Sequence, residues 1–232
     1  MLEHGGRLRA AAARYGIPAG DWLDLSTGIN PDPWPVPPLP ASAWQRLPED
    51  DDGLEAAAAS LYGNPGLLPV AGSQAAIQLL PALLPRAAVA CVAPLYAEHP
   101  HCWQKAGHHV RLIEGSLSRA LAAATPYVLL CNPNNPTATA HTRAALLHAA
   151  GELQRRGGWL IVDEAFIDPT PADSVADLAG TPAAPRLIVL RSLGKFFGLA
   201  GARVGFVLAA PELLQRMRAE LGPWTVSGPA RS

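Results

Sequence analysis

The 232-residue chain is 49% hydrophobic and 16% charged, with a formal net charge of −1 at pH 7. This balance predicts a soluble globular protein with a sizeable core, and it favours neither nucleic acid nor an anionic membrane as a partner. Apolar runs stop well short of the roughly 18 residues of a membrane span, and the N-terminus lacks the pattern of a signal peptide. With three cysteines and no export signal, buried thiols and a cytoplasmic location are expected.

The first 48 residues predict an irregular arm. A short helix is expected near residues 7–15, and an extended piece at residues 23–26. The dense prolines between residues 30 and 48 disfavour both helix and sheet. A further helix is predicted at residues 53–61, and it should end at Tyr62-Gly63.

From residue 68 onward, short apolar runs alternate with helical stretches, which are expected at residues 74–84, 117–124 and 143–156. Uninterrupted apolar strands between helices predict an α/β fold, with a mostly parallel seven-stranded sheet flanked by helices. Ligands of such sheets bind beyond the carboxyl ends of the strands. The expected strands are 68–71, 88–93, 110–113, 127–131, 159–162, 187–190 and 203–208.

Lys195 carries the strongest chemical signal, because the chain has only one other lysine, Lys105, against sixteen arginines. Lysine is the side chain that bonds covalently to an aldehyde cofactor. Ser192 precedes it by three residues and Arg203 follows it by eight, and both side chains bind anions. The pattern favours a phosphorylated aldehyde, pyridoxal phosphate. On this motif alone, a surface lysine in a glycine-rich loop is an equally good reading.

Polar residues also follow other predicted strands. Ser73 and Gln74 open a helix, where free N–H groups bind anions. Asn135 lies in a stiff Asn-Pro turn and can donate to a phenolate oxygen. Asp163 would pair with a protonated pyridine nitrogen, and Tyr96 would stack on a flat ring. Each has a plainer explanation, as a turn or a core aromatic, but their succession at strand ends indicates one cofactor site.

In this order the motifs resemble those of the fold-type-I pyridoxal-phosphate enzymes, the aspartate aminotransferase superfamily, from about residue 4 to the end of the chain. The resemblance implies that Lys195 bonds to the cofactor, that Asp163 meets the pyridine nitrogen and that Asn135 contacts the phenolic oxygen. It implies stacking by Tyr96, with His99 behind the aspartate. The residues implied to bind the cofactor phosphate are Ser73, Gln74, Ser192 and Arg203.

Tyr62 matches a family tyrosine that reaches the cofactor phosphate of the neighbouring subunit. The resemblance therefore implies a homodimer with shared active sites. It also implies three parts of the chain, an N-terminal arm at 1–48, a cofactor-binding large domain at 49–222, and the start of a largely missing small domain at 223–232. Because the small domain of the family supplies the arginine that grips the substrate carboxylate, we expect this chain to bind cofactor but to turn over substrate poorly.

Within the superfamily, the chain resembles the branch of histidinol-phosphate aminotransferases and threonine-phosphate decarboxylases, and residues 4–6, 24–31 and 222–230 resemble the decarboxylases of the cobalamin pathway. The decarboxylase side fits better, because Phe166 stands where aminotransferases usually carry a hydrogen-bonding tyrosine. The implied reaction is pyridoxal-phosphate-dependent decarboxylation of L-threonine O-3-phosphate to (R)-1-amino-2-propanol O-2-phosphate, in cobalamin biosynthesis. The alternatives are a histidinol-phosphate aminotransferase-like transaminase and a truncated cofactor-binding chain without activity.

The N-terminal arm is expected to cover the substrate, a small phosphorylated amino acid. His4, Gly5, Gly6 and Asn30 are its candidate ligands, although a frayed terminus explains the same residues. Ala138 replaces the usual glycine after Asn-Pro-Thr, so the turn is expected to avoid a positive φ there.

Two other classes of site are disfavoured. A nucleotide-binding P-loop at Gly194-Lys195 lacks the required glycine at Val189 and the required Ser or Thr at Phe196. A metal site is not expected, because the spacing of the candidate ligands matches no zinc pattern. Those candidates are His99, His101, Cys102, His108 and His109.

Overall fold

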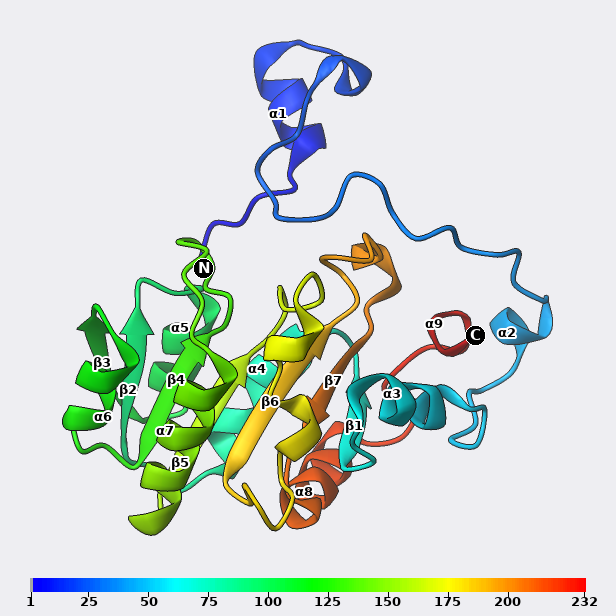
Figure 1. The fold of residues 1–232 in the computed structure, drawn as a ribbon. Helices are drawn as coiled ribbons and strands as arrows, with labels where there is room; N and C mark the ends of the chain where they lie inside the picture. Colours follow the sequence, from blue (N-terminus) through cyan, green and yellow to red (C-terminus); the bar gives the residue numbers. More distant parts are fainter. Residues whose placement is uncertain (1) are drawn as a thin grey trace.

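A single seven-stranded sheet organises the computed structural model, which describes residues 2–232 (Figure 1). The strand order is β1-β7-β6-β5-β4-β2-β3, in which β7 is antiparallel to both neighbours and the other pairs are parallel. The predicted mostly parallel seven-stranded sheet is therefore confirmed. The strands are β1 (Leu67–Val70), β2 (Ala88–Ala93), β3 (His109–Glu114), β4 (Tyr127–Cys131), β5 (Trp159–Asp163), β6 (Leu187–Ser192) and β7 (Gly205–Leu208).

Helices cover both faces of the sheet, as the apolar character of its strands requires. Helices α4, α5 and α8 pack on one face, and α3, α6 and α7 pack on the other. Two further short helices, α2 and α9, contact each other beside the sheet. The helices are α1 (Leu8–Tyr15), α2 (Ser42–Gln45), α3 (Leu54–Tyr62), α4 (Ser73–Leu83), α5 (Glu98–Lys105), α6 (Leu117–Ala122), α7 (Arg143–Arg155), α8 (Pro211–Leu221) and α9 (Gly228–Arg231).

Some elements differ from the sequence prediction. Helices α5 and α8 were not predicted, although each begins near an acidic residue and ends near a basic one. Pro100 lies in the first turn of α5, where its missing N–H breaks no helical hydrogen bond. Strand β7 begins at Gly205 rather than at residue 203, because Arg203 has a left-handed backbone with φ of 57°. Residues 23–26 form no strand.

The central strands fix the position of the site. In β4 and β5, alternate side chains enter the two cores, so Val128 and Leu160 face one helical layer whereas Leu129 and Ile161 face the other. Both strands are almost completely buried. Polar side chains in this region therefore begin only where the parallel strands end.

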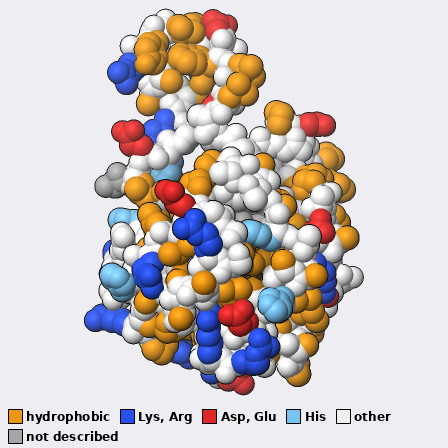
Figure 2. All heavy atoms as spheres, turned by 60° about the vertical axis from the view of Figure 1, so that its left-hand side comes forward, with side chains coloured by type: hydrophobic (Ala, Val, Ile, Leu, Met, Phe, Trp, Pro, Cys, Tyr) orange, Lys and Arg blue, Asp and Glu red, His pale blue; other side chains and the backbone are white. Residues whose placement is uncertain are grey.

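The N-terminal arm leaves the body of the protein. Residues 7–26 form a lobe around α1 that projects beyond the sheet, and the following chain returns along the body to α2 (Figure 1). No residue of α1 is buried. Figure 2 shows that this lobe carries many apolar side chains. Among residues 2–232, no helix has the length and apolar character needed to cross a bilayer.

Candidate functional site

A cavity of about 680 Å³, its open mouth included, lies at the carboxyl ends of β4, β5 and β6. The last residues of these three strands, Cys131, Asp163 and Ser192, all line it. Eight of the nine residues predicted to bind the cofactor line this one cavity, and they come from five separate segments. They are Ser73, Gln74, Tyr96, Asn135, Asp163, Ser192, Lys195 and Arg203.

One end of the cavity is built to receive an anion. The first N–H groups of α4, at Ser73 and Gln74, have no acceptor within the helix. The Arg203 guanidinium lies against Gly72, where a Cβ would come within 2.6 Å of it. A Cβ on Gly205 would likewise come within 2.6 Å of the Ser73 nitrogen. Two glycines thus leave room for a cation and a helix N-terminus to meet a phosphate.

Asp163 forms the opposite, acidic end. Its Oδ2 atom lies 2.8 Å from His99 Nε2, and its Oδ1 atom accepts from the Ala165 N–H at 3.0 Å. Both side chains of the Asp163–His99 pair are buried. The two hydrogen bonds hold the carboxylate in one orientation, and its charge offers a partner for a buried cationic ring nitrogen.

Lys195 also lines the cavity, and the charges of Asp163 and Arg203 both act on it. Burial lowers the pKa of its ammonium, the Asp163 charge opposes that shift and the Arg203 charge adds to it. Its Nζ atom lies 5.5 Å from the centroid of the Phe166 ring, an apolar neighbour that offers no hydrogen bond. The lysine is therefore more easily obtained as the neutral amine, the form that attacks an aldehyde.

Asn135 and Tyr96 complete the wall of the cavity. The structure places both side chains along the lining, as predicted for contacts with the phenolic oxygen and the ring face. Cys131 lies deeper, and burial followed by the Asp163 charge raises the pKa of its thiol far above the usual range. The thiol therefore stays protonated and forms part of the cavity wall, and it is not a nucleophile.

Gln74 has separate roles for its side chain and its backbone. Its side-chain amide donates to Glu98 Oε2 at 2.8 Å, and its oxygen accepts from the Tyr96 hydroxyl at 3.4 Å. The side-chain donor is thus occupied within the protein. For a phosphate, Gln74 offers its backbone N–H at the start of α4.

None of the predicted substrate ligands lines the cavity, although His4 and Asn30 contact residues beside it. His4 contacts Glu98, and the Gly6 N–H donates to Ser26 Oγ at 2.8 Å. A Cβ on Gly5 would fall 1.9 Å from the Ser26 carbonyl oxygen, so only glycine allows this approach. The Asn30 N–H donates to the Lys195 carbonyl at 3.0 Å, which brings the arm beside the loop that carries the lysine. Their contact with substrate stays a prediction.

Tyr62 lies outside this cavity. Its ring packs 4.6 Å from the Arg191 guanidinium and meets Phe206 edge-on, and burial raises its pKa to about 12. Within a single chain it touches none of the predicted phosphate ligands, so its role toward a second subunit stays a prediction.

The expectation for Ala138 is wrong. Its φ is 58°, in the left-handed region that the turn was expected to avoid. The Ala138 N–H donates to the Asn134 carbonyl at 2.7 Å, and the Asn134 N–H donates to the Thr139 carbonyl at 2.8 Å. These hydrogen bonds hold the turn closed, and they outweigh the cost of a left-handed alanine, about 1 kcal/mol.

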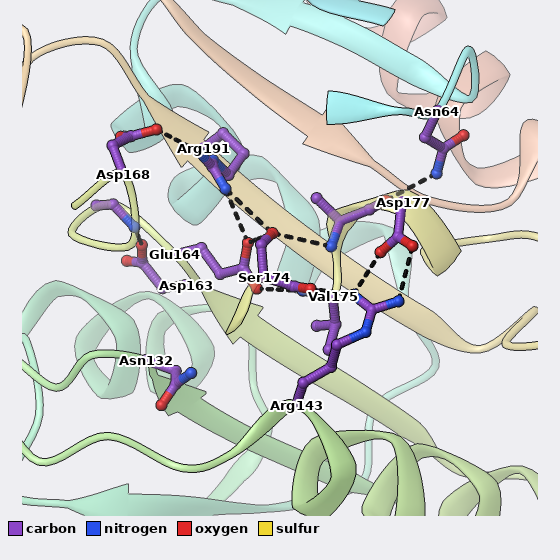
Figure 3. Close-up of polar contacts among 12 residues, drawn as sticks. Asn64, Asn132, Arg143, Asp163, Glu164, Asp168, Ser174, Val175, Asp177 and Arg191 are labelled. Carbon is purple, nitrogen blue, oxygen red and sulfur yellow. Dashed lines mark hydrogen bonds and ion pairs between the residues drawn. The ribbon is translucent and has the colours of Figure 1, made fainter. Parts of the chain in front are cut away.

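Two groups of charged residues escaped the sequence analysis. Glu98 lies at the rim, between the arm and Gln74. Arg191 and Glu164 form an ion pair behind the cavity, together with Asp168 (Figure 3). The sequence did contain a signal for this pair. Glu164 follows Asp163 and Arg191 precedes Ser192, so the alternation of side chains along a strand turns both to the face opposite the cavity.

A possible metal-binding group also lies in the described residues, although no metal was expected. Ligand atoms of His99, Cys131 and Asp163 lie within 4.8 Å of one another. The His99–Asp163 hydrogen bond accounts for two of them, and the raised thiol pKa of Cys131 disfavours the thiolate that a metal requires. The cluster therefore belongs to the wall of the cavity.

The donor set fits pyridoxal phosphate. The cavity contains an anion seat, a carboxylate held by hydrogen bonds, and a lysine whose pKa is lowered by burial. The Tyr96 ring and the Asn135 amide supply a flat contact and a donor along the wall. Each polar end of the cofactor thus finds a partner of opposite charge.

Comparison with known proteins identifies relatives over the whole chain. Residues 42–232 match the family described as aminotransferase class I and II. The chain is 56% identical over 231 residues to threonine-phosphate decarboxylase of Pseudomonas aeruginosa, covering 100% of this chain and 69% of that protein. It is 48% identical over 234 residues to a Sinorhizobium protein of the same name, covering 99% and 69% respectively. The solved structure of aspartate aminotransferase from Thermus thermophilus with maleate superposes with a TM-score of 0.78 at 18% identity, covering 100% of this chain and 68% of that one.

Proposed function

The chain belongs to the aminotransferase class I and II family, and from that premise we propose that the protein decarboxylates L-threonine O-3-phosphate with pyridoxal phosphate as its cofactor. The product is (R)-1-amino-2-propanol O-2-phosphate, which serves as the linker in cobalamin biosynthesis. The observation that carries the proposal is the 56% identity with the Pseudomonas decarboxylase, because the matched length covers the whole chain and therefore the cavity.

Pyridoxal phosphate, when bound, supplies an electron-accepting ring that draws in the electron pair of the breaking bond between Cα and the carboxylate. Asp163 keeps a negative charge at the ring-nitrogen end, and His99 with the Ala165 N–H prevents that carboxylate from turning away. Arg203 and the start of α4 hold the phosphate end. The two ends together fix how the substrate Cα is presented.

Lys195 does the proton chemistry. Its Nζ atom lies inside the cavity, and its lowered pKa favours the neutral amine that reacts with the cofactor aldehyde. As a free amine, the same atom would be placed to return a proton to Cα after carbon dioxide leaves. Phe166 offers no hydrogen bond, so Asn135 carries more of the contact with the phenolic oxygen than in enzymes with a tyrosine there.

The proposal also covers the oligomeric state, the location and the domain organisation of the protein. We infer a homodimer in the cytoplasm, with the arm at 1–48, the cofactor-binding domain at 49–222 and the start of a small domain at 223–232. The exposed apolar side chains of Trp34, Trp44 and Leu47 support burial of the arm against further protein. Arg203 is the one arginine among the described residues that line the cavity, so the substrate carboxylate needs another partner.

Product analysis tests the proposal directly. The protein is incubated with pyridoxal phosphate and threonine phosphate labelled in its carboxyl carbon, and released carbon dioxide is counted. Because the chain spans 69% of the decarboxylase it matches, cofactor binding is measured separately, by the absorbance of the bound cofactor. Carbon dioxide release supports the proposal. Glutamate formation from histidinol phosphate and 2-oxoglutarate, without carbon dioxide, would replace it with an aminotransferase.

A further inference from the structure

Glu98, at the start of α5, joins two parts of the molecule that are far apart in sequence. Its Oε1 atom lies 2.6 Å from His4 Nε2, and its Oε2 atom accepts from Gln74 Nε2 at 2.8 Å. The Glu98 side chain is 12% exposed, whereas His4 is 42% exposed. Burial opposes ionisation of Glu98, but the hydrogen bonds from His4 and Gln74 prevail and lower its pKa. The carboxylate is thus held as an anion at the rim.

The arm is attached to the body of the protein at two places. The second is at residues 28–34, where the Asn30 N–H donates to the Lys195 carbonyl and the Trp34 N–H donates to the Phe197 carbonyl at 2.9 Å. Gly28 adds a close approach to Phe166, since a Cβ there would lie 2.9 Å from the ring. This attachment consists of several backbone contacts. In contrast, the attachment at His4 is made by a pair of side chains.

We propose that Glu98 is a positioning residue that clamps the N-terminal end of the arm onto the cavity rim and, through Gln74, ties that clamp to the cofactor wall. His4 is held with its ring 6.1 Å from the Tyr96 ring, so the clamp places the histidine beside a side chain of the cavity wall. The same carboxylate takes the Gln74 donor and turns the Gln74 oxygen toward the Tyr96 hydroxyl. The inference rests on the proposed function for its substrate, but the clamp exists before any turnover.

The test uses hydrogen exchange followed by mass spectrometry on the cofactor-loaded protein. In Glu98→Gln, an NH2 group replaces one of the two carboxylate oxygens, so the side chain cannot accept from both His4 and Gln74, and it carries no charge for His4. Exchange in the peptide covering residues 4–15 is expected to rise at least tenfold, while residues 28–34 stay within about twofold. Glu152→Gln is the matched control, because it breaks a glutamate–histidine contact on α7, far from the cavity. It should leave both peptides unchanged.

A second measurement separates positioning from general stability. Threonine phosphate is titrated while the absorbance of the bound cofactor is followed. The dissociation constant of threonine phosphate should rise at least tenfold in Glu98→Gln, while the dissociation constant of pyridoxal phosphate changes less than threefold. Adding Glu98→Gln to His4→Ala should increase exchange of residues 4–15 no further. Unchanged exchange in that peptide, or equal increases across the sheet, would overturn the clamp whatever reaction the enzyme catalyses.

Discussion

Two polar clusters share the carboxyl ends of β5 and β6 on opposite faces of the sheet. Asp163 and Ser192 face the cavity, whereas Glu164 and Arg191, their sequence neighbours, face away. On the far side, Arg191 bonds to Glu164 at 3.1 Å and pairs with Asp168 (Figure 3). The Tyr62 ring packs against its guanidinium. Burial raises the pKa of both carboxyls against the pull of Arg191, so their ionised forms depend on that arginine.

The cavity side is organised differently. None of the ion pairs among residues 2–232 includes Lys195 or Arg203. The charges of Arg191, Glu164 and Asp168 are thus paired within the chain, whereas the cations of Lys195 and Arg203 are available to a ligand. From this difference we infer that the Arg191 cluster has a structural role. The residues of the cavity are kept for binding and catalysis, at some cost in the free energy of unfolding.

The largest expected effect is loss of catalysis in Lys195→Ala, by at least about 10³-fold, since a covalent catalytic group is removed. The absorbance of bound cofactor should disappear as well. Removing a partly buried, unpaired cation should leave the free energy of unfolding of the cofactor-free protein unchanged or higher. Urea unfolding and turnover measure the two effects. Lys105→Ala is the control, and equal absorbance in both variants would contradict the assignment.

The Arg191 cluster should show the reverse pattern. Arg191→Gln leaves two buried carboxylates without their cation, so the free energy of unfolding should fall by about 3–5 kcal/mol. Arg143→Gln is the matched control, because its pair with Asp177 is 31% and 41% exposed and should contribute only about 1 kcal/mol. Urea unfolding of the cofactor-free proteins measures both. Similar losses would show that burial does not separate the two pairs.

Asp163 combines features of the two clusters. It is paired with His99, yet it faces the cavity. In Asp163→Ala, cofactor affinity should fall by about 2–5 kcal/mol, because a charged hydrogen bond to a buried cation is lost. Equilibrium titration with pyridoxal phosphate measures the change, and Asp21→Ala, which alters an exposed carboxylate, is the control. Equal affinities would remove Asp163 from the site.

The sheet and most of the cavity were predictable because their signals are local. Apolar runs such as β4 and polar residues at strand ends follow directly from the sequence, and the topology of a parallel sheet brings those ends together. The clamp at Glu98 was not predictable, since it depends on where the arm crosses the body. Likewise, the pairing of Arg191 with Glu164 depends on which face each side chain takes at the end of its strand.

The smallest expected effect lies in the turn that follows β4 at the cavity edge. Ala138 has a φ of 58°, which costs an L-residue about 1 kcal/mol but costs glycine little. Ala138→Gly should therefore raise the free energy of unfolding by about 0.5–1 kcal/mol, less the entropy that glycine gains in the unfolded chain. Ala140→Gly, two residues on and without a positive φ, should lower it slightly. Urea unfolding of the two variants and the parent protein measures the sign of each change in the free energy of unfolding. If both variants are less stable than the parent, the turn relaxes around Ala138 and the left-handed alanine costs little. A stabilised Ala138→Gly protein with unchanged cofactor affinity would show that the strain at this edge serves neither the fold nor the site.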